Sequence, residues 1–158
     1  MNKGKAVELH AVLRALGSQE SPMRLTLARN LQVLAGVEKE FSDARNDKFQ
    51  ELVLLDKSGE PVLDPVAKKA VEEGRLPANV RLPFASYKYE DKDGAKQMAE
   101  FVEELQKEEV DVKLIPIRLQ KQIKVGEEKM TLEEYLDSVE CKIDSNALSL
   151  LLESGILV

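Results

Sequence analysis

The side chains that most often act as nucleophiles or general bases are scarce in this chain of 158 residues, which has one histidine and one cysteine. On a helix, the neighbours of His10 are Ala6 and Arg14, and neither could orient it as a base or share a metal ion with it. Cys141 has no second cysteine with which to bind zinc or form a redox pair. We therefore interpret both residues as structural.

A run of glutamates is the next possible source of chemistry. Its members are Glu100, Glu103, Glu104, Glu108 and Glu109. Carboxylates can hold a metal ion or transfer protons, but a spacing of three, four and one residues is typical of the solvated side of an amphipathic helix. Two interpretations stay open, which are a water-facing surface and an acidic face of Glu100, Glu103 and Glu104 that binds a partner.

Two smaller groups could serve as contact sites. Tyr87 and Tyr89 could form an aromatic interface, or one of them could pack on a helix. Arg118, Lys121 and Lys124 are the densest basic group, but no aromatic residues are interleaved with them, as they would be in a single-strand binding surface. The net charge of −6 also argues against affinity for a phosphate backbone. We expect no nucleic-acid partner.

Sequence motifs of the common enzymes are missing from the chain. It contains no EF-hand loop, no GxxxxGK followed by Ser or Thr, no GxGxxG and no GxSxG. The single cysteine excludes an intramolecular disulfide. No apolar run approaches the roughly 20 residues that cross a bilayer, and the first 20 residues lack the apolar core of a signal peptide. We expect a soluble cytoplasmic protein that is not an enzyme and needs no metal or cofactor.

One long helix dominates the elements that must position these residues. After a short helix at 5–16, Ser21 and Pro22 predict an N-cap and a first-turn proline. Residues then follow at steps of three or four that are apolar except for Lys48, namely Met23, Leu27, Leu31, Leu34, Val37, Phe41, Ala44, Lys48, Leu52 and Leu55. A helix reaching Asp56 would be roughly 50 Å long if it continues through Gly36. Such a stripe must either receive several neighbours or face another molecule.

The rest of the chain alternates short elements with turns. A turn at 56–61 precedes a short helix capped by Asp64, and 75–90 looks extended, with Val80, Leu82 and Phe84 alternating along one face. A helix at 94–109 should lie antiparallel to the long one. A strand is predicted at 110–119 and a hairpin around Gly126. Two short helices follow, the first begun by the capping box of Thr131 and Glu134.

These elements predict a single α+β domain over 1–158 that is predominantly helical. It divides into a helical part at 5–56, a turn, short helix and extended connection at 57–93, a helix and strand at 94–119, and a hairpin with two helices at 120–158. The architecture is a long helix hairpin with short flanking helices and a small edge sheet. No Trp and seven Phe and Tyr residues require a core of Leu, Val, Ile and Ala.

The order of these elements resembles an uncharacterised family of small phage and prophage proteins of unknown function. The resemblance lies in KAVELHAVLRAL, SPMRLTLARNLQVL, DKSGEPV and KQMAEFVEELQKEEVDVKLIPI, and it extends to about Leu119. The connection at 63–89 is longer than is usual in that family. The resemblance transfers no catalytic residue, and it implies a phage-encoded protein found in the host cytoplasm or in the virion.

Three hypotheses about function follow from these observations. The first is a virion-associated or assembly protein that binds other proteins or itself through an interface of Leu27, Leu31, Leu34 and Phe41, with Tyr87 and Tyr89. The second is a phage inhibitor that uses the acidic face to occlude a host or defence protein. The third is an enzyme with a carboxylate site that no motif reveals.

Overall fold

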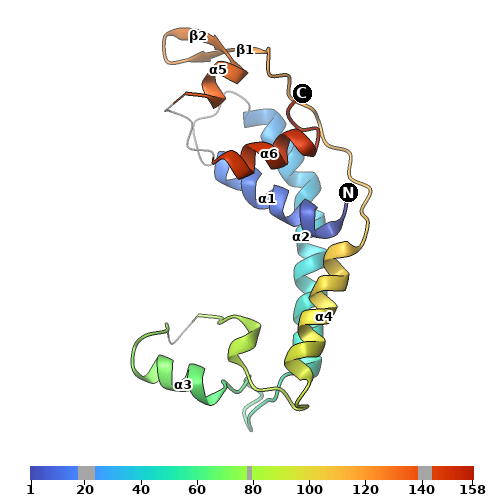
Figure 1. Cartoon of the computed structure of the whole chain (residues 1–158), viewed down its shortest axis with the longest axis vertical. Helices are drawn as coiled ribbons and strands as arrows, with labels where there is room; N and C mark the ends of the chain where they lie inside the picture. The colour runs from blue at the N-terminus through green and yellow to red at the C-terminus, as the bar shows by residue number, and fades with distance from the viewer. Residues whose placement is uncertain (18–23, 78–79, 139–143) are drawn as a thin grey trace. The chain divides into compact units, whose positions relative to one another are not determined.

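The chain is a predominantly helical α+β protein (Figure 1). The computed structural model describes residues 1–17, 24–77, 80–138 and 144–158. The α-helices in these ranges are α1 (Lys3–Gly17), α2 (Arg24–Leu52), α3 (Pro65–Glu72), α4 (Gly94–Lys107), α5 (Leu132–Leu136) and α6 (Ser145–Glu153). A short 3₁₀ turn, η1, covers Phe84–Ser86. The strands β1 (Gln122–Val125) and β2 (Glu128–Thr131) form an antiparallel hairpin.

These elements belong to two compact units. Unit 1 contains residues 1–41 and 106–158, and unit 2 contains residues 42–105. Helix α2 contributes its residues up to Phe41 to unit 1 and the remainder to unit 2. The chain therefore enters and leaves unit 2 through helical segments.

Helix α2 is continuous through Gly36 and has 29 residues. Its predicted N-cap, Ser21, lies outside the described residues. The predicted end at Asp56 was wrong, because the helix stops at Leu52, whose carbonyl accepts a hydrogen bond from the Glu90 amide at 3.1 Å. The Leu54 amide donates to the Lys88 carbonyl at 2.9 Å. Pairing with an extended segment thus replaces the last helical turn.

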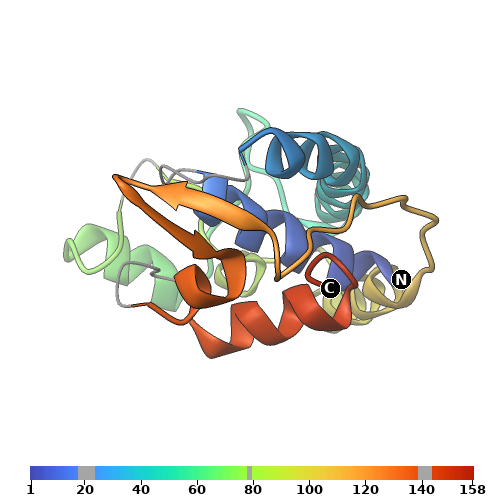
Figure 2. The ribbon, with the colours of Figure 1, turned by 90° about the horizontal axis from the view of Figure 1, so that it is seen from above.

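The core of unit 1 is almost entirely aliphatic. Helix α1 packs beside α6 (Figure 2), and the first part of α2 adds Leu27, Leu34 and Val37. The other buried members are Ala6, Leu9, Leu13, Leu16, Ile117, Ile123, Leu132, Tyr135, Leu151, Ile156 and Leu157. Leucine and alanine at helical spacing provide most of this surface, as the composition predicts.

The strand predicted at 110–119 is the main error of the sequence-based fold. This segment is extended, and its alternating Val110, Val112 and Leu114 do pack partly buried on the core. Its hydrogen bonds, however, go to separate partners: the Val110 amide donates to the Met1 carbonyl at 2.9 Å and the Ile117 amide to the Ile156 carbonyl at 2.6 Å. Among the described residues, no single neighbour runs beside this segment for long enough to form a ladder.

A buried asparagine fills the gap between those two pairings. The Nδ2 group of Asn30 donates to the Ile115 carbonyl at 3.0 Å, and its Oδ1 accepts from the Ile115 amide at 2.7 Å. Asn30 is fully buried. One side chain of α2 therefore makes both hydrogen bonds that a strand partner would have made.

Unit 2 is built around an aromatic cluster. Phe49 of α2 lies 4.9 Å from the ring of Phe84, 5.1 Å from that of Tyr87 and 6.3 Å from that of Tyr89, measured between centroids. Helix α4 runs antiparallel to the part of α2 in this unit (Figure 1), as the sequence predicts, and adds Met98 to the cluster.

The face predicted for Val80, Leu82 and Phe84 is only partly formed. Leu82 is buried, but Val80 is 61% exposed, and η1 begins at Phe84 just after Pro83. The pairing occurs further along the chain, where Tyr87 bridges to Leu63 and Tyr89 bridges to Val53. Proline cannot donate to a ladder, so pairing is displaced beyond Pro83.

Local capping signals were reliable throughout the described residues. Asp64 caps α3 by accepting from the Ala67 amide at 2.7 Å, and Asp144 caps α6 by accepting from the Ala147 amide at 2.8 Å. Gly126, between the hairpin strands, has a φ of 61°, which a side chain would strain. These interactions lie within a few residues, so the sequence alone specifies them.

Two helical glycines give opposite predictions on substitution by alanine. A Cβ atom at Gly94 would lie 2.5 Å from the Cβ of Tyr89, so Gly94→Ala should destabilise the fold by about 1–3 kcal/mol. At Gly36 nothing lies within 4 Å of an added Cβ, so Gly36→Ala should stabilise it by about 0.5–1 kcal/mol. Urea denaturation followed by circular dichroism tests both, and equal midpoints for the two variants would contradict this packing.

Candidate functional site

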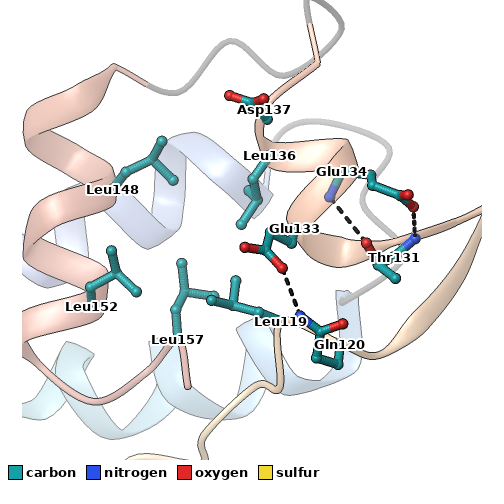
Figure 3. Close-up of a pocket in the computed structure, with 10 residues that line it drawn as sticks. All are labelled: Leu119, Gln120, Thr131, Glu133, Glu134, Leu136, Asp137, Leu148, Leu152 and Leu157. Atoms are coloured by element: carbon teal, nitrogen blue, oxygen red, sulfur yellow. Dashed lines mark hydrogen bonds between the residues drawn. The ribbon is translucent and has the colours of Figure 1, made fainter.

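An open pocket of about 610 Å³ on unit 1 lies between α5, α6 and the segment leading into the hairpin (Figure 3). We refer to it as the α5–α6 groove. It is lined by Leu119, Gln120, Thr131, Glu133, Glu134, Leu136, Asp137, Leu148, Leu152 and Leu157. This volume is within the usual range of ligand and peptide pockets.

Helix α5 is placed on one side of the groove by a capping box. The Glu134 amide donates to the Thr131 hydroxyl at 3.2 Å, and the Thr131 amide donates to the Glu134 carboxylate at 2.6 Å. Thr131 is also the last residue of β2, so α5 starts directly at the end of the hairpin. The hydroxyl of Thr131 is thereby occupied with a structural hydrogen bond.

The opposite side of the groove is formed by α6 and the residues that follow it. Gly155, with a φ of 72°, turns the chain back after the helix. The Leu119 amide then donates to the Val158 carbonyl at 2.7 Å, and the Val158 amide donates to the Ile117 carbonyl at 3.0 Å. This pairing places Leu119 and Leu157 at the base of the groove.

The floor of the groove is apolar. Figure 3 shows the side chains of Leu119, Leu136, Leu148, Leu152 and Leu157 directed toward a common space. Leu157 is buried, whereas Leu152 is 51% exposed. The exposed leucine makes the floor accessible from solvent, and covering it would remove apolar surface from water.

The rim of the groove is acidic. It carries Glu133, Glu134 and Asp137, and none of the ten described lining residues is basic. The side-chain Nε2 group of Gln120 donates to the Glu133 carboxylate at 2.7 Å. The hydrogen bonds from the backbone amide and hydroxyl of Thr131 hold the pKa of Glu134 below its ordinary value of 4.5. Glu134 therefore stays negatively charged at neutral pH.

This arrangement presents apolar side chains and carboxylates to a ligand. The lining side chains contain no histidine, cysteine or lysine, and the one hydroxyl is used in the cap. Among the described residues, no group of three or more His, Cys, Asp or Glu side chains is arranged to hold a metal ion. An apolar floor with a charged rim is the usual composition of a peptide-binding surface.

The glutamate run splits between the two units. Glu108 and Glu109 pair with Lys3 at 2.6 Å and with the amino group of Met1 at 3.3 Å. In unit 2, Glu100, Glu103 and Glu104 are exposed on α4. Glu100 lies 3.6 Å from Lys96, so a positive charge borders the acidic face at one end.

The predicted apolar interface lies mainly inside the fold. Leu27, Leu34 and Phe41 are buried and Leu31 is half-buried. The first two, with Leu31, pack in the core of unit 1. Contact between these side chains and a partner stays a prediction, and it would require the core to open.

The two tyrosines of the predicted interface pack on Phe49 instead of standing free. The Tyr89 hydroxyl donates to the Phe84 carbonyl at 2.8 Å, and the Tyr87 hydroxyl accepts from the Leu82 amide at 3.2 Å. Burial raises the pKa of Tyr89. Their polar ends thus hold the extended segment in place, which is a structural role.

The remaining candidates from the sequence are not brought together. His10 is half-buried in α1, and Cys141 lies outside the described residues. Arg118, Lys121 and Lys124 are exposed around the start of the hairpin. None of these described side chains lines the α5–α6 groove.

The groove residues were not predicted as a site from the sequence. One signal was present: α6 carries leucine at 148, 150, 151 and 152, and a short helix cannot direct consecutive leucines to one core. Only Leu151 is fully buried. A helix that is apolar around most of its circumference indicates contacts on more than one side.

No described helix is both long enough and apolar enough to cross a membrane. The comparisons with known proteins provide no further constraint on the groove. No protein-family model matches the chain, and neither a curated protein nor a solved structure shows significant similarity to it.

Proposed function

We propose that this chain is a phage-encoded, non-catalytic protein that acts through protein–protein contacts as a virion-associated protein or assembly factor. The α5–α6 groove is the observation that supports binding, because it exposes Leu152 beside four further leucines. The phage origin rests on the resemblance of the helical segments and turns described from the sequence.

The inhibitor hypothesis depends on the acidic face of α4. A nucleic-acid mimic requires a continuous negative surface, and the ion pair between Lys96 and Glu100 offsets one of the three carboxylates of this face. The α5–α6 groove combines charge with an apolar floor, which the acidic face lacks. The groove is therefore the better supported binding surface.

Capture of partners by matched variants tests the proposal. Wild type, Leu152→Asp and Val66→Asp are immobilised and exposed to an extract of bacteria that naturally express the gene. Val66 is 77% exposed on α3 and lies in unit 2, so Val66→Asp introduces the same charge in place of an exposed apolar side chain away from the groove. We expect proteins retained by wild type and Val66→Asp to be lost with Leu152→Asp.

Capture that does not depend on Leu152 would contradict the proposal, and so would the absence of any protein above the bare support. Light scattering across a range of concentrations tests whether the partner is a second copy of the chain. A defined oligomer that dissociates in Leu152→Asp but not in Val66→Asp would make the partner another copy of this chain.

A further inference from the structure

We infer that the α5–α6 groove receives a basic amphipathic segment of a partner protein, in which leucine-like side chains alternate at helical spacing with Lys or Arg. This inference rests on the proposed function, since it specifies the partner of the same groove. The apolar side chains of the segment would cover the leucine floor, and its cations would meet the acidic rim.

Charge complementarity is the first argument. Glu133, Glu134 and Asp137 line the groove, and none of them makes an ion pair with a Lys or Arg among the described residues. A partner segment with negative charges would meet repulsion at this rim, whereas a positive one would be attracted and correctly oriented. The lining carboxylates therefore favour a positively charged partner, while Arg118 and Lys121 are exposed on either side of the lining residues Leu119 and Gln120.

Carboxylates on the side of α6 that faces α1 also support charge complementarity with a basic partner. A neighbouring pocket of about 480 Å³ between α1 and α6 is lined by Ala147 and Leu150, and its acidic members are Glu8, Asp144 and Glu153. Glu153 pairs with Lys5 at 3.1 Å. Because Lys5 offsets the charge of Glu153, the acidity on this second side of α6 comes from Glu8 and Asp144.

The leucine floor determines the other half of the partner's chemistry. Five leucines line one surface, so a purely polar cation, such as a polyamine or a lysine-rich tail, would leave Leu152 exposed. An amphipathic helix places apolar anchors on one side and cations on its flanks, which is the arrangement required here. Nucleic acid is disfavoured because its phosphates would face the carboxylates.

Three labelled synthetic peptides of about 14 residues, near the length at which an isolated helix becomes stable, serve as probes. The first combines leucine with lysine at helical spacing. The second replaces lysine by glutamate, and the third replaces leucine by serine. Binding to the full chain is followed by fluorescence anisotropy at about 0.15 M and about 1 M salt, between which the screening length falls from about 8 to about 3 Å.

The variants distinguish binding at the α5–α6 groove from nonspecific attraction of the peptide to the negative charge of the protein. The double variant Glu133→Lys and Asp137→Lys reverses the charge at two positions of the rim. Glu134 is kept because its carboxylate completes the capping box. Glu100→Lys with Glu104→Lys makes the same change of charge on the acidic face of α4. Circular dichroism verifies that each variant keeps its helical content, and Leu152→Ser provides an uncharged test of the floor.

We expect the leucine–lysine peptide to bind wild type and the α4 variant alike, and to bind the rim variant and Leu152→Ser at least about tenfold more weakly, or about 1.4 kcal/mol. Binding should weaken at high salt. The glutamate and serine peptides should bind at least about tenfold more weakly to wild type. Equal loss of binding in the α4 and rim variants would overturn the inference.

Failure of this inference can be distinguished from failure of the proposed function. If the glutamate peptide binds as well as the lysine peptide, the choice of a basic partner is wrong although the groove still binds protein. If no peptide binds while capture from the extract still depends on Leu152, the inference is also overturned and the proposed function stands. Capture that is independent of Leu152 overturns the proposed function itself.

Discussion

Replacing Phe49 with alanine is expected to destabilise the protein by about 3–5 kcal/mol. Phe49 is 1% exposed, and its ring contacts the rings of Phe84, Tyr87 and Tyr89. The truncation removes the side chain that all three share, so both the buried apolar area and the aromatic contacts are lost. No other described aromatic side chain of unit 2 is buried to this degree.

Urea denaturation with near-ultraviolet circular dichroism measures this effect. The chain has no tryptophan and three tyrosines, two of which, Tyr87 and Tyr89, adjoin Phe49 and report on its surroundings. Gln50→Ala changes the next, exposed residue of the same helix and should alter stability by less than about 0.5 kcal/mol. If Phe49→Ala is as stable as Gln50→Ala, the aromatic cluster does not hold unit 2 together.

Replacing Asn30 with alanine is expected to destabilise the protein by about 2–3 kcal/mol. The change leaves the amide and the carbonyl of Ile115 without the partners that Asn30 provides at 2.7 and 3.0 Å, and partly buried backbone groups without partners are costly. For a chain of this length, the melting temperature should fall by about 6–12 °C. Hydrogen exchange at the Ile115 amide should become faster.

Asn30→Leu separates the hydrogen bonds from the loss of volume. It keeps a side chain of similar size in the core but restores neither hydrogen bond, so it should also destabilise. The matched control is Gln32→Ala, which changes an exposed amide on the same helix and should have little effect. An Asn30→Leu variant more stable than wild type would show that hydrophobic burial at this position outweighs both hydrogen bonds.

The same asparagine explains why one strand was predicted where none forms. Alternation at Val110, Val112 and Leu114 correctly predicts which side chains face the core. A strand also needs a neighbouring backbone in register, and this depends on residues far away in the chain. At Ile115 the partner is Asn30, which is separated from it by 85 positions, and no local pattern shows that contact.

The long apolar stripe illustrates a second limit of sequence patterns. Spacing identified Leu27, Leu34 and Phe41 as one face of a helix, and all three are buried. Periodicity shows that a face is apolar, but it does not show what covers it. The α5–α6 groove went unpredicted for the complementary reason, since its floor joins Leu119, Leu136 and Leu152 from separate elements.

By itself, the sequence determined the features that depend on interactions within a few residues. These include the capping box of Thr131 and Glu134, the N-cap at Asp64, the turn at Gly126 and the helical character of the chain. Their partners lie within one helical turn or one hairpin, so local residue types are sufficient to specify them.

Only the tertiary structure decided which surfaces are covered and which are left open. It buried Leu27, Leu34 and Phe41 of the predicted stripe, paired the segment at 110–119 with Asn30, and left Leu152 exposed in the α5–α6 groove. Each of these outcomes depends on segments distant in sequence occupying one place. Burial is a property of the packed chain, and a binding surface is the part of the apolar surface that this packing does not cover.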